Sequence, residues 1–244
     1  MEAYLKSKQR RCTCNFIEWV DVLVRYLKRK GVRFENDMPV IPSEMLVKAV
    51  PDGVTMLPSS KRSTSKKPCG DILCNFEGDG YLYCHVRSIV NAIQRGDDAV
   101  AKVIAPYREF FAVAGFDLTI TPGMDRCEQD MLFLLNWLLD ATLAVNGVHI
   151  IPNFRIGNER QAERFAVFPK GLCYALGRIG EEKNAPHLDE YLTRLRVMFA
   201  RPGKLLVYGY RKSSSIPLLE ELGVAYECFE DYRHASYGLK KGVM

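Results

Sequence analysis

The sequence predicts an α/β fold in which a mostly parallel sheet of six or seven strands is covered by helices. From residue 81 onward, apolar strand patterns alternate with amphipathic helix patterns, and the connections between them are short. The strand candidates are nearly continuous apolar runs, such as LLVY at 205–208, as strands buried on both faces of a sheet require. The sheet is expected to be either an irregular or incomplete (β/α) barrel or an open, doubly wound sheet.

Residues 1–60 are expected to form a helical and extended segment that packs on this core. The stretch 16–31 has a helical apolar stripe (Ile17, Val20, Leu23, Val24 and Leu27) and ends at a glycine, and VTMLPSS at 54–60 is a strand candidate. Residues 61–80 begin with a run rich in Ser and Lys, which indicates a basic flexible loop. This loop is either a solvated linker or an arm that contacts phosphate.

Residues 81–235 are expected to form the α/β core domain, and 236–244 a mobile tail. In this core, YLYCHV at 81–86 is predicted to be a strand, followed by helical sequence at 87–111 that breaks near Pro106. Further strands are predicted at FDLTITP, VHIIP, LCYALG, KLLVYGY and VAYECFE. The helices between them are predicted at 125–147, 184–203 and 215–223, where Asp125, Asn184 and Gly147 are suitable end residues.

In both architectures a ligand binds at the carboxyl ends of the strands. Polar residues gather after the predicted strands, and arginine is suited to two-point recognition of phosphate or carboxylate. We therefore predict an anion-binding mouth formed by Asn153, Arg155, Arg178, Tyr210, Arg211 and Arg233. The alternative for each arginine is a solvated side chain or a local ion pair. Arg160 and Arg164 are left out because Glu159 and Glu163 are ordinary partners for them.

Three acids are candidates for catalysis. Asp117 lies inside an apolar strand pattern, where a carboxylate either anchors a loop or has a perturbed pKa and does chemistry. Glu227 and Asp231 lie in and after the last predicted strand, and either can serve as a base or a nucleophile. The sequence contains no phosphate-binding G-x-x-x-x-G-K-[ST] loop, no G-x-G-x-x-G fingerprint and no H-E-x-x-H pair, so it lacks the usual signatures of ATP, dinucleotide and zinc-protease sites.

Two cysteine pairs lie in polar surroundings, in RCTCN and PCGDILC. Cys12, Cys14, Cys69 and Cys74 are either four zinc ligands supplied by two loops or four free thiols. No stretch has the roughly 18 apolar residues of a membrane span, and the amino-terminal stretch lacks the apolar segment of a secretory signal. We therefore expect a cytoplasmic protein without a membrane partner. The net charge of +5 is compatible with a polyanionic partner but does not require one.

From about Tyr81 to Glu230, the chain resembles a family of uncharacterised domains found in phages, prophages and bacterial mobile elements. The resemblance rests on YLYCHV, YREFFAVAGFDLTITPGM, NGVHIIPNFRIG, GLCYALGRIG and RPGKLLVYGY, in this order. The chain has CHVRS where these proteins tend to have a pair of aspartates. This resemblance implies a parallel α/β architecture and a phage-type protein in the cytoplasm of a bacterial host, and it implies no particular activity.

The last third of the chain is similar to transglycosylases that exchange guanine for a deazaguanine in tRNA or DNA. YALGRIG, KLLVYGY and LGVAYECFEDYRHASYG carry the similarity. It implies a barrel whose nucleophile is an acid at the end of the last strand, which here is Glu227, or Glu230 or Asp231 in a shifted alignment. The family has Asp at this position, and its zinc site is C-terminal, whereas the cysteine pairs of this chain are N-terminal.

Two functions follow as expectations. The first is a phage-type protein that binds a nucleotide or nucleic acid at the strand ends and exchanges a base in it. The second is a non-catalytic accessory or counter-defence protein that captures a host protein or a signalling nucleotide. An acid-to-amide change at a catalytic residue is harmful only in the first case.

Overall fold

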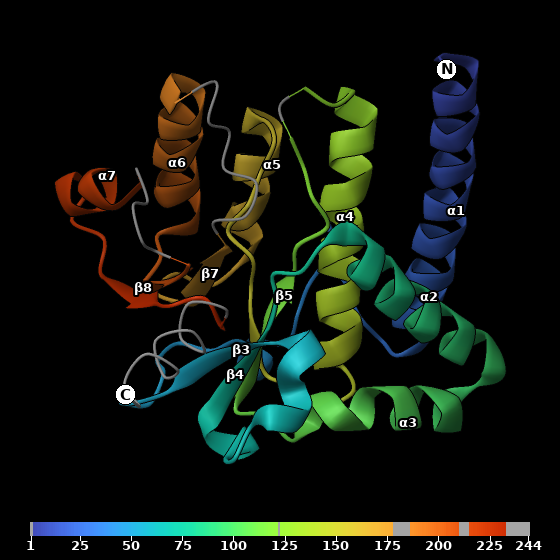
Figure 1. Ribbon diagram of the computed structural model, residues 1–244, viewed down its shortest axis with the longest axis horizontal. Helices are drawn as coiled ribbons and strands as arrows, with labels where there is room; N and C mark the ends of the chain where they lie inside the picture. Colours follow the sequence, from blue (N-terminus) through green and yellow to red (C-terminus); the bar gives the residue numbers. More distant parts are fainter. Residues whose placement is uncertain (1, 122, 178–185, 210–214, 233–244) are drawn as a thin grey trace, which may run out of the picture.

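The computed structural model describes residues 2–121, 123–177, 186–209 and 215–232, excluding the side chains of 2–14, 186–188 and 215. Within these residues, parallel strands form a sheet of four and a sheet of three, confirming the α/β prediction (Figure 1). The first sheet contains β3 (Thr55–Pro58), β4 (Asp71–Asn75), β5 (Ala112–Phe116) and β6 (Ile150–Ile151). The second contains β7 (Cys173–Gly177), β8 (Lys204–Tyr208) and β9 (Tyr226–Phe229).

The two sheets join beyond the end of β6. Asn153 forms a parallel bridge with Ala175 of β7, and the backbone N–H groups of Phe154 and Ala175 donate to Ala175 and Pro152, at 2.8 and 2.9 Å. The strands therefore follow one another in chain order from β3 to β9. A doubly wound sheet would reverse its strand order, so this order is that of an irregular (β/α) barrel. Among the described residues, β9 does not pair with β3.

The inner face of this curved sheet is filled with small and aromatic side chains. Its buried cluster includes Met56, Ile72, Cys74, Phe76, Ala112, Ala114, Ile151, Cys173, Ala175, Leu206, Tyr208 and Phe229. Gly177 allows Phe76 to cross this interior, because a Cβ at Gly177 would lie 2.7 Å from the Phe76 ring. The Phe76 ring in turn packs on Tyr208, with 5.8 Å between centroids. The barrel interior is therefore a packed core and not a channel.

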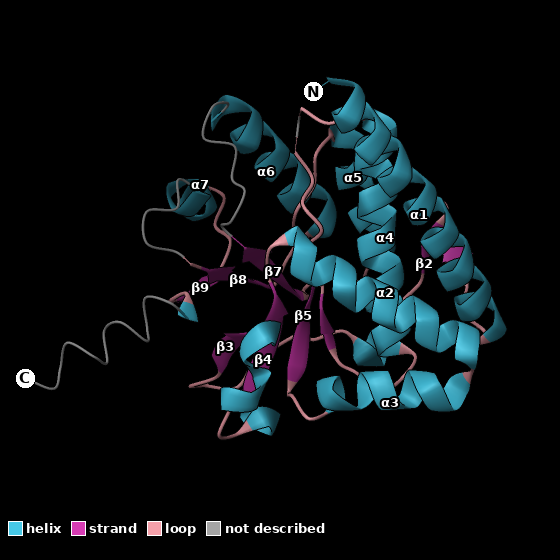
Figure 2. Ribbon diagram, turned by 45° about the vertical axis from the view of Figure 1, so that its right-hand side comes forward, coloured by secondary structure: helices cyan, strands magenta, loops and turns pink. Residues whose placement is uncertain are grey.

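Helices cover the outer face of the strands (Figure 2). They are α1 (Glu2–Arg29), α2 (Asp79–Arg95), α3 (Asp97–Arg108), α4 (Arg126–Ala144), α5 (Glu159–Arg164), α6 (Pro186–Ala200) and α7 (Ser215–Glu221). A short hairpin of β1 (Phe34–Glu35) and β2 (Met38–Pro39) packs on α4. Helix α4 also packs against both α1 and β5, which explains why it is buried on nearly every side. Within the described part of the chain, no helix is long and apolar enough to cross a bilayer.

Three predicted elements were wrong. FDLTITP is not a strand, because β5 ends at Phe116 and residues 117–121 follow it as a loop. YLYCHV is not a strand but lies in α2, where Leu82, Val86, Ile89 and Ile93 continue one buried helical stripe. A six-residue apolar run does not distinguish strand from helix periodicity when it is read alone. The predicted basic flexible loop at 61–80 instead contains two 3₁₀ helices, η2 (Ser59–Thr64) and η3 (Pro68–Gly70), and the buried strand β4. The sheet consequently begins at β3, before residue 81.

Candidate functional site

The carboxyl ends of β5, β6 and β7 meet in a buried network centred on Asp117. Asn153 donates its Nδ2 hydrogens to Asp117 Oδ1 at 2.8 Å and to the Phe116 carbonyl at 3.1 Å. The Arg155 guanidinium lies 2.7 Å from Asp117 Oδ1 through Nε, and its Nη2 donates to the Gly177 carbonyl at 3.1 Å. The structure therefore brings together Asn153 and Arg155, which we selected after one predicted strand, and Asp117, which was predicted to lie inside another but follows β5.

This network differs from the predicted one in the direction of its side chains. Asn153 and Arg155 were expected to face a ligand, whereas most of their polar atoms bind Asp117 and the backbone. Asn153 Oδ1 accepts the backbone N–H of Arg155 at 3.0 Å, which fixes the turn after β6. The Arg155 side chain is 9% exposed and that of Asp117 is 6% exposed. Asn153 and Arg155 thus fix the position of the Asp117 carboxyl.

Burial dominates the electrostatics of Asp117. Desolvation raises the pKa of its carboxyl above the ordinary value, while the charge of Arg155 and the hydrogen bond from Asn153 oppose this rise. The negative charge of Asp79 raises the pKa of Asp117 further. A buried carboxyl with a raised pKa at the ligand-binding end of a barrel is typical of a group that accepts and returns protons.

Helix α4 positions the backbone on both sides of Asp117. Asp140 accepts the N–H of Phe116 at 3.0 Å, and Asn136 accepts the N–H of Leu118 at 3.0 Å and donates to its carbonyl at 3.3 Å. Gly115 makes the first contact possible, because a Cβ there would lie 2.2 Å from Asp140 Oδ2. Sequence reasoning missed Asn136 and Asp140. Their signal was two polar residues one turn apart in the mostly apolar second half of this helix.

Replacement of Asp140 by Asn is expected to reduce the pH dependence of stability. Burial raises the pKa of Asp140 well above its ordinary value. The folded state therefore binds more protons than the unfolded state above about pH 4, and the free energy of unfolding falls as the pH rises toward the folded pKa. Asparagine keeps the acceptor for Phe116 without this titration. In urea denaturation, the free energy of unfolding should fall more between pH 5 and pH 8 for the wild type than for Asp140→Asn. Equal falls in the two proteins would contradict the raised pKa of Asp140.

A second acid lies beside Asp117 at the start of α2. Asp79 is the first residue of this helix and accepts both the backbone N–H and the hydroxyl of Thr119, at 3.0 and 2.9 Å. It follows β4 in the chain, so it comes from another strand end than Asp117. Sequence reasoning missed Asp79 because YLYCHV was expected to be a strand, which placed this aspartate at the wrong end of a strand.

The ends of β3, β4, β8 and β9 contribute further polar groups to the same end of the barrel. Glu77 accepts the backbone N–H of Ser60 in η2 at 2.8 Å. Burial first, and then the neighbouring Cys74, Asp231 and Glu77, raise the pKa of the Tyr208 phenol. Tyr208 also accepts the backbone N–H of Tyr232 at 3.0 Å. Asp231 and Glu77 both lie close enough to Tyr208 to affect its pKa, although they are far apart in the sequence.

Helix η2 brings positive charge to these strand ends. Lys61 and Arg62 are exposed, and the Lys61 ammonium lies 5.9 Å from the centroid of the Tyr232 ring. The positive charge of Arg62 contributes to the lowered pKa of His85, although burial is the larger cause. His85 Nδ1 and the Tyr107 hydroxyl are 2.6 Å apart. The basic segment predicted as a loop is thus folded against the carboxyl ends of the strands.

Glu227 is not part of this cluster. It is the second residue of β9, opposite Leu206 of β8, and it accepts a hydrogen bond from Lys204 at 3.1 Å. Lys204 is the first residue of β8, so this ion pair lies toward the amino ends of the strands. Of the three predicted catalytic acids, Asp117 and Asp231 are at the carboxyl ends and Glu227 is not. The predicted Arg178, Tyr210, Arg211 and Arg233 lie outside the described residues.

The four predicted zinc ligands do not come from two loops. Cys12 and Cys14 lie in α1, and their side chains are outside the described set. Cys69 lies in η3 and is exposed, whereas Cys74 is fully buried in β4, where burial raises the pKa of its thiol. A raised thiol pKa opposes the thiolate form that zinc binds. Among the side chains that the structure describes, no three His, Cys, Asp or Glu residues form a group able to hold a metal ion.

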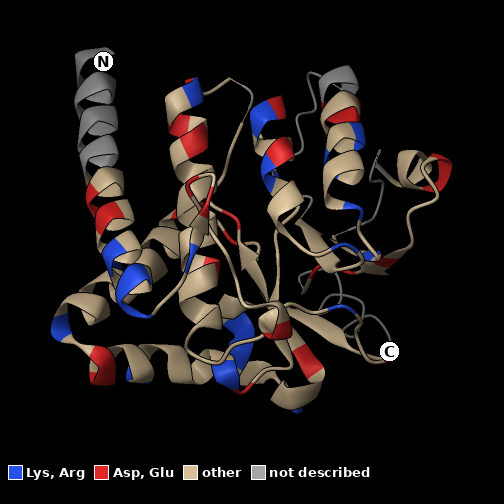
Figure 3. Cartoon of the chain, turned by 180° about the vertical axis from the view of Figure 1, so that it is seen from behind, with Lys and Arg blue, Asp and Glu red and all other residues tan. Residues whose placement is uncertain are grey.

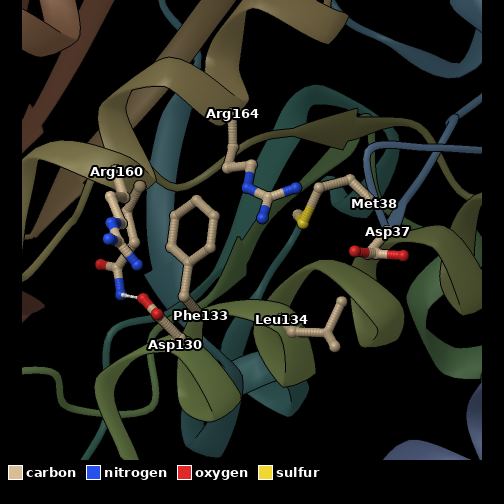
Figure 4. A pocket seen from close by; sticks show the side chains of 8 residues that line it. Asp37, Met38, Asp130, Phe133, Leu134, Arg160 and Arg164 are labelled. Atoms are coloured by element: carbon tan, nitrogen blue, oxygen red, sulfur yellow. Dashed lines mark hydrogen bonds between the residues drawn. The ribbon is translucent and has the colours of Figure 1, made fainter. Parts of the chain in front are cut away.

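Among the residues that the structure describes, positive and negative charges are mixed over the helices. Figure 3 shows Lys and Arg interspersed with Asp and Glu along the ends of several helices. The expected ion pairs of Arg160 and Arg164 with Glu159 and Glu163 are absent from the described residues, and both arginines instead line a pocket between α4 and α5 (Figure 4).

No protein-family model matches the chain, and no curated protein or solved structure matches it.

Proposed function

We propose that the protein binds a nucleotide or a nucleic-acid strand at the carboxyl ends of its strands and exchanges a base in it. The observation that carries this proposal is that the buried Asp117, with its raised pKa, lies at the same end of the barrel as the basic helix η2. A bound nucleic acid needs positive charge for its phosphates, and base exchange needs acids at the glycosidic bond. Both kinds of group are available at this end.

The acids support a transglycosylase-like reaction. Cleavage of a glycosidic bond requires a proton for the leaving base and a carboxylate for the positive charge that develops on the sugar. Asp117 suits the proton transfer, because burial raises the pKa of its carboxyl while Arg155 opposes this rise. Asp231 suits the second task, since it follows β9 and is only partly buried. Under this proposal the nucleophile of the resembled transglycosylases corresponds to Asp231, whereas Glu227 is bound to Lys204.

The cations support a contact with phosphate. Lys61 and Arg62 are exposed on η2, and neither forms an ion pair with a described acid. Each phosphate contact made by such a side chain releases counterions, so binding weakens as the salt concentration rises. The Tyr232 ring beside Lys61 adds an aromatic surface on which a base can stack.

Replacement of Lys61 and Arg62 together by Ala is expected to weaken nucleic-acid binding and to reduce its salt dependence. With a fluorescein-labelled single-stranded DNA, the slope of log K against log salt should become smaller by about 1.4, which is roughly 0.7 for each lost contact. Fluorescence anisotropy between low and physiological salt measures the slope. Lys102→Ala is the control and should leave the slope unchanged. Lys102 is exposed on α3, which precedes the amino end of β5.

Two outcomes of this titration would contradict the proposal. One is flat salt dependence of the wild-type protein, which would exclude several phosphate contacts. The other is an equal loss in the η2 double variant and in Lys102→Ala, which would indicate a general charge effect. The same titration with RNA of the same sequence would show which sugar the site prefers.

A further inference from the structure

A pocket lies outside the barrel, between α4, α5 and the β1–β2 hairpin. Its volume is about 180 Å³, and it is lined by Asp37, Met38, Asp130, Phe133, Leu134, Arg160, Gln161 and Arg164 (Figure 4). None of these residues belongs to the strand-end cluster around Asp117. The pocket is therefore separate from the site of the proposed function, and it can be tested without reference to that function.

The walls of this pocket are fixed by hydrogen bonds between α4 and α5. Asn158 caps α5 by accepting the N–H of Gln161 at 3.2 Å, and its Nδ2 donates to Gln129 at 2.8 Å and to Asp130 at 3.2 Å. Gln161 donates to Asp130 at 2.8 Å and accepts the N–H of Gly157 at 2.7 Å. These polar groups are mostly buried, so α5 is held in one position on α4.

The hairpin supplies the remaining wall. Asn36 and Asp37 have φ values of 50° and 64° and form its two-residue turn, as is typical of a type I′ turn. This turn places Asp37 at the pocket and Met38 in the core beneath it, where Met38 is 3% exposed. The turn of the hairpin and the capped helix α5 therefore fix the backbone positions from which side chains extend into the pocket.

Within the described residues, the guanidinium groups of Arg160 and Arg164 have neither a hydrogen bond nor an ion pair. The two residues are one turn apart on α5, so they project from the same side of the helix. In Figure 4 the Phe133 ring lies between them, and the Arg164 guanidinium extends toward Met38. Met38, Phe133 and Leu134 provide apolar surface beside these charges. Asp37 and Asp130 leave the lining without a net charge, which disfavours polyanions.

We propose that this pocket binds a small organic carboxylate with a compact apolar body. The carboxylate would pair with the Arg164 guanidinium, which extends toward Met38, and the apolar body would contact Met38, Phe133 and Leu134. A volume of about 180 Å³ suits a body of this kind, because cavities of roughly 150 Å³ hold one benzene molecule. Pairing of carboxylate with arginine supplies the orientation, and the two acids exclude ligands with several negative charges.

Titration with benzoate tests this proposal. Amide chemical shifts of the isotope-labelled protein should change saturably at 37–38, 130–134 and 160–164, with a dissociation constant in the millimolar range. Arg164→Gln should weaken binding about tenfold, because it removes a charge-assisted hydrogen bond, whereas Arg160→Gln, on the other side of the Phe133 ring, should weaken it less. Arg87→Gln is the matched control, since Arg87 is exposed on α2 away from the pocket, and its variant should bind as the wild type does.

Two other probes separate the contributions of charge and apolar surface. Benzamide has the same ring without the charge and should bind more weakly than benzoate. Inorganic phosphate should also bind more weakly, because it makes no apolar contact. Benzamide binding as tight as benzoate binding, tighter phosphate binding, or benzoate affinity unchanged in both arginine variants would overturn the proposal. Absence of saturable shifts with benzoate would overturn it as well.

Discussion

Replacement of Asp117 by Asn is expected to reduce base exchange by about 100-fold or more, the usual effect of removing a general acid or base. The amide keeps nearly the same shape but cannot transfer the proton that the leaving base needs. Incorporation of radiolabelled guanine into bacterial tRNA and into duplex DNA measures the reaction. Glu227→Gln is the matched acid-to-amide control, and it should retain activity because Glu227 pairs with Lys204 toward the amino ends of the strands.

A second variant separates chemistry from folding. Asp117→Asn leaves the buried Arg155 without its charged partner, so a loss of activity alone would not distinguish the two. Asp231→Asn changes a partly exposed acid after β9 and should also lose activity while unfolding at the wild-type temperature. Full activity of Asp231→Asn, or loss in Glu227→Gln instead, would contradict the assignment. No incorporation by the wild type into either nucleic acid would contradict base exchange while leaving the DNA-binding result intact.

Replacement of Arg155 by Ala is expected to lower the free energy of unfolding by about 3–5 kcal/mol. The reason is that Asp117 would keep its burial but lose the cation that compensates its charge, and the Gly177 carbonyl would lose its donor. Urea denaturation at neutral pH measures the loss. Lys204→Ala is the control, because the Lys204–Glu227 pair is more than one-third exposed and such pairs contribute about 0–1 kcal/mol.

The double variant tests the cause of this loss. If the uncompensated charge of Asp117 is responsible, then Arg155→Ala combined with Asp117→Asn should be more stable than Arg155→Ala alone. Residues in direct contact are expected to show non-additive changes of this kind. A double variant whose loss equals the sum of the single losses would contradict the coupling between the two side chains.

The alternation of apolar strands and helices was sufficient to predict the fold class, because a parallel sheet requires crossover helices. It was insufficient for single elements. At 16–31 two helical stripes overlap, and the predicted one began at Ile17, which is 58% exposed. The buried stripe instead starts at Phe16 and continues through Trp19 and Leu23. The choice between such stripes depends on α4, a partner that is distant in the sequence.

The site was predictable in position but not in detail. Asn153 and Arg155 could be selected because parallel strands place their carboxyl ends together, and Asp117 because it is an acid inside an apolar run. The pairing of Arg155 with Asp117 could not be predicted, since it depends on the distance between two side chains on different strands. Glu227 was misjudged for a related reason. An apolar run such as VAYECF does not show where the strand begins, and the difference of a few residues moves a side chain from one end of the barrel to the other.

The missing pairing between β9 and β3 has a consequence for the solubility of the protein. In the described residues each of these strands has a neighbour on one side only, so its free edge can recruit a strand from another molecule. Both edges are short, with four residues each, and β3 ends in Pro58, which has no N–H to donate. These are the features by which natural proteins limit edge-to-edge aggregation. Substitutions that lengthen either edge, Pro58→Val among them, should therefore favour aggregation before they alter the site.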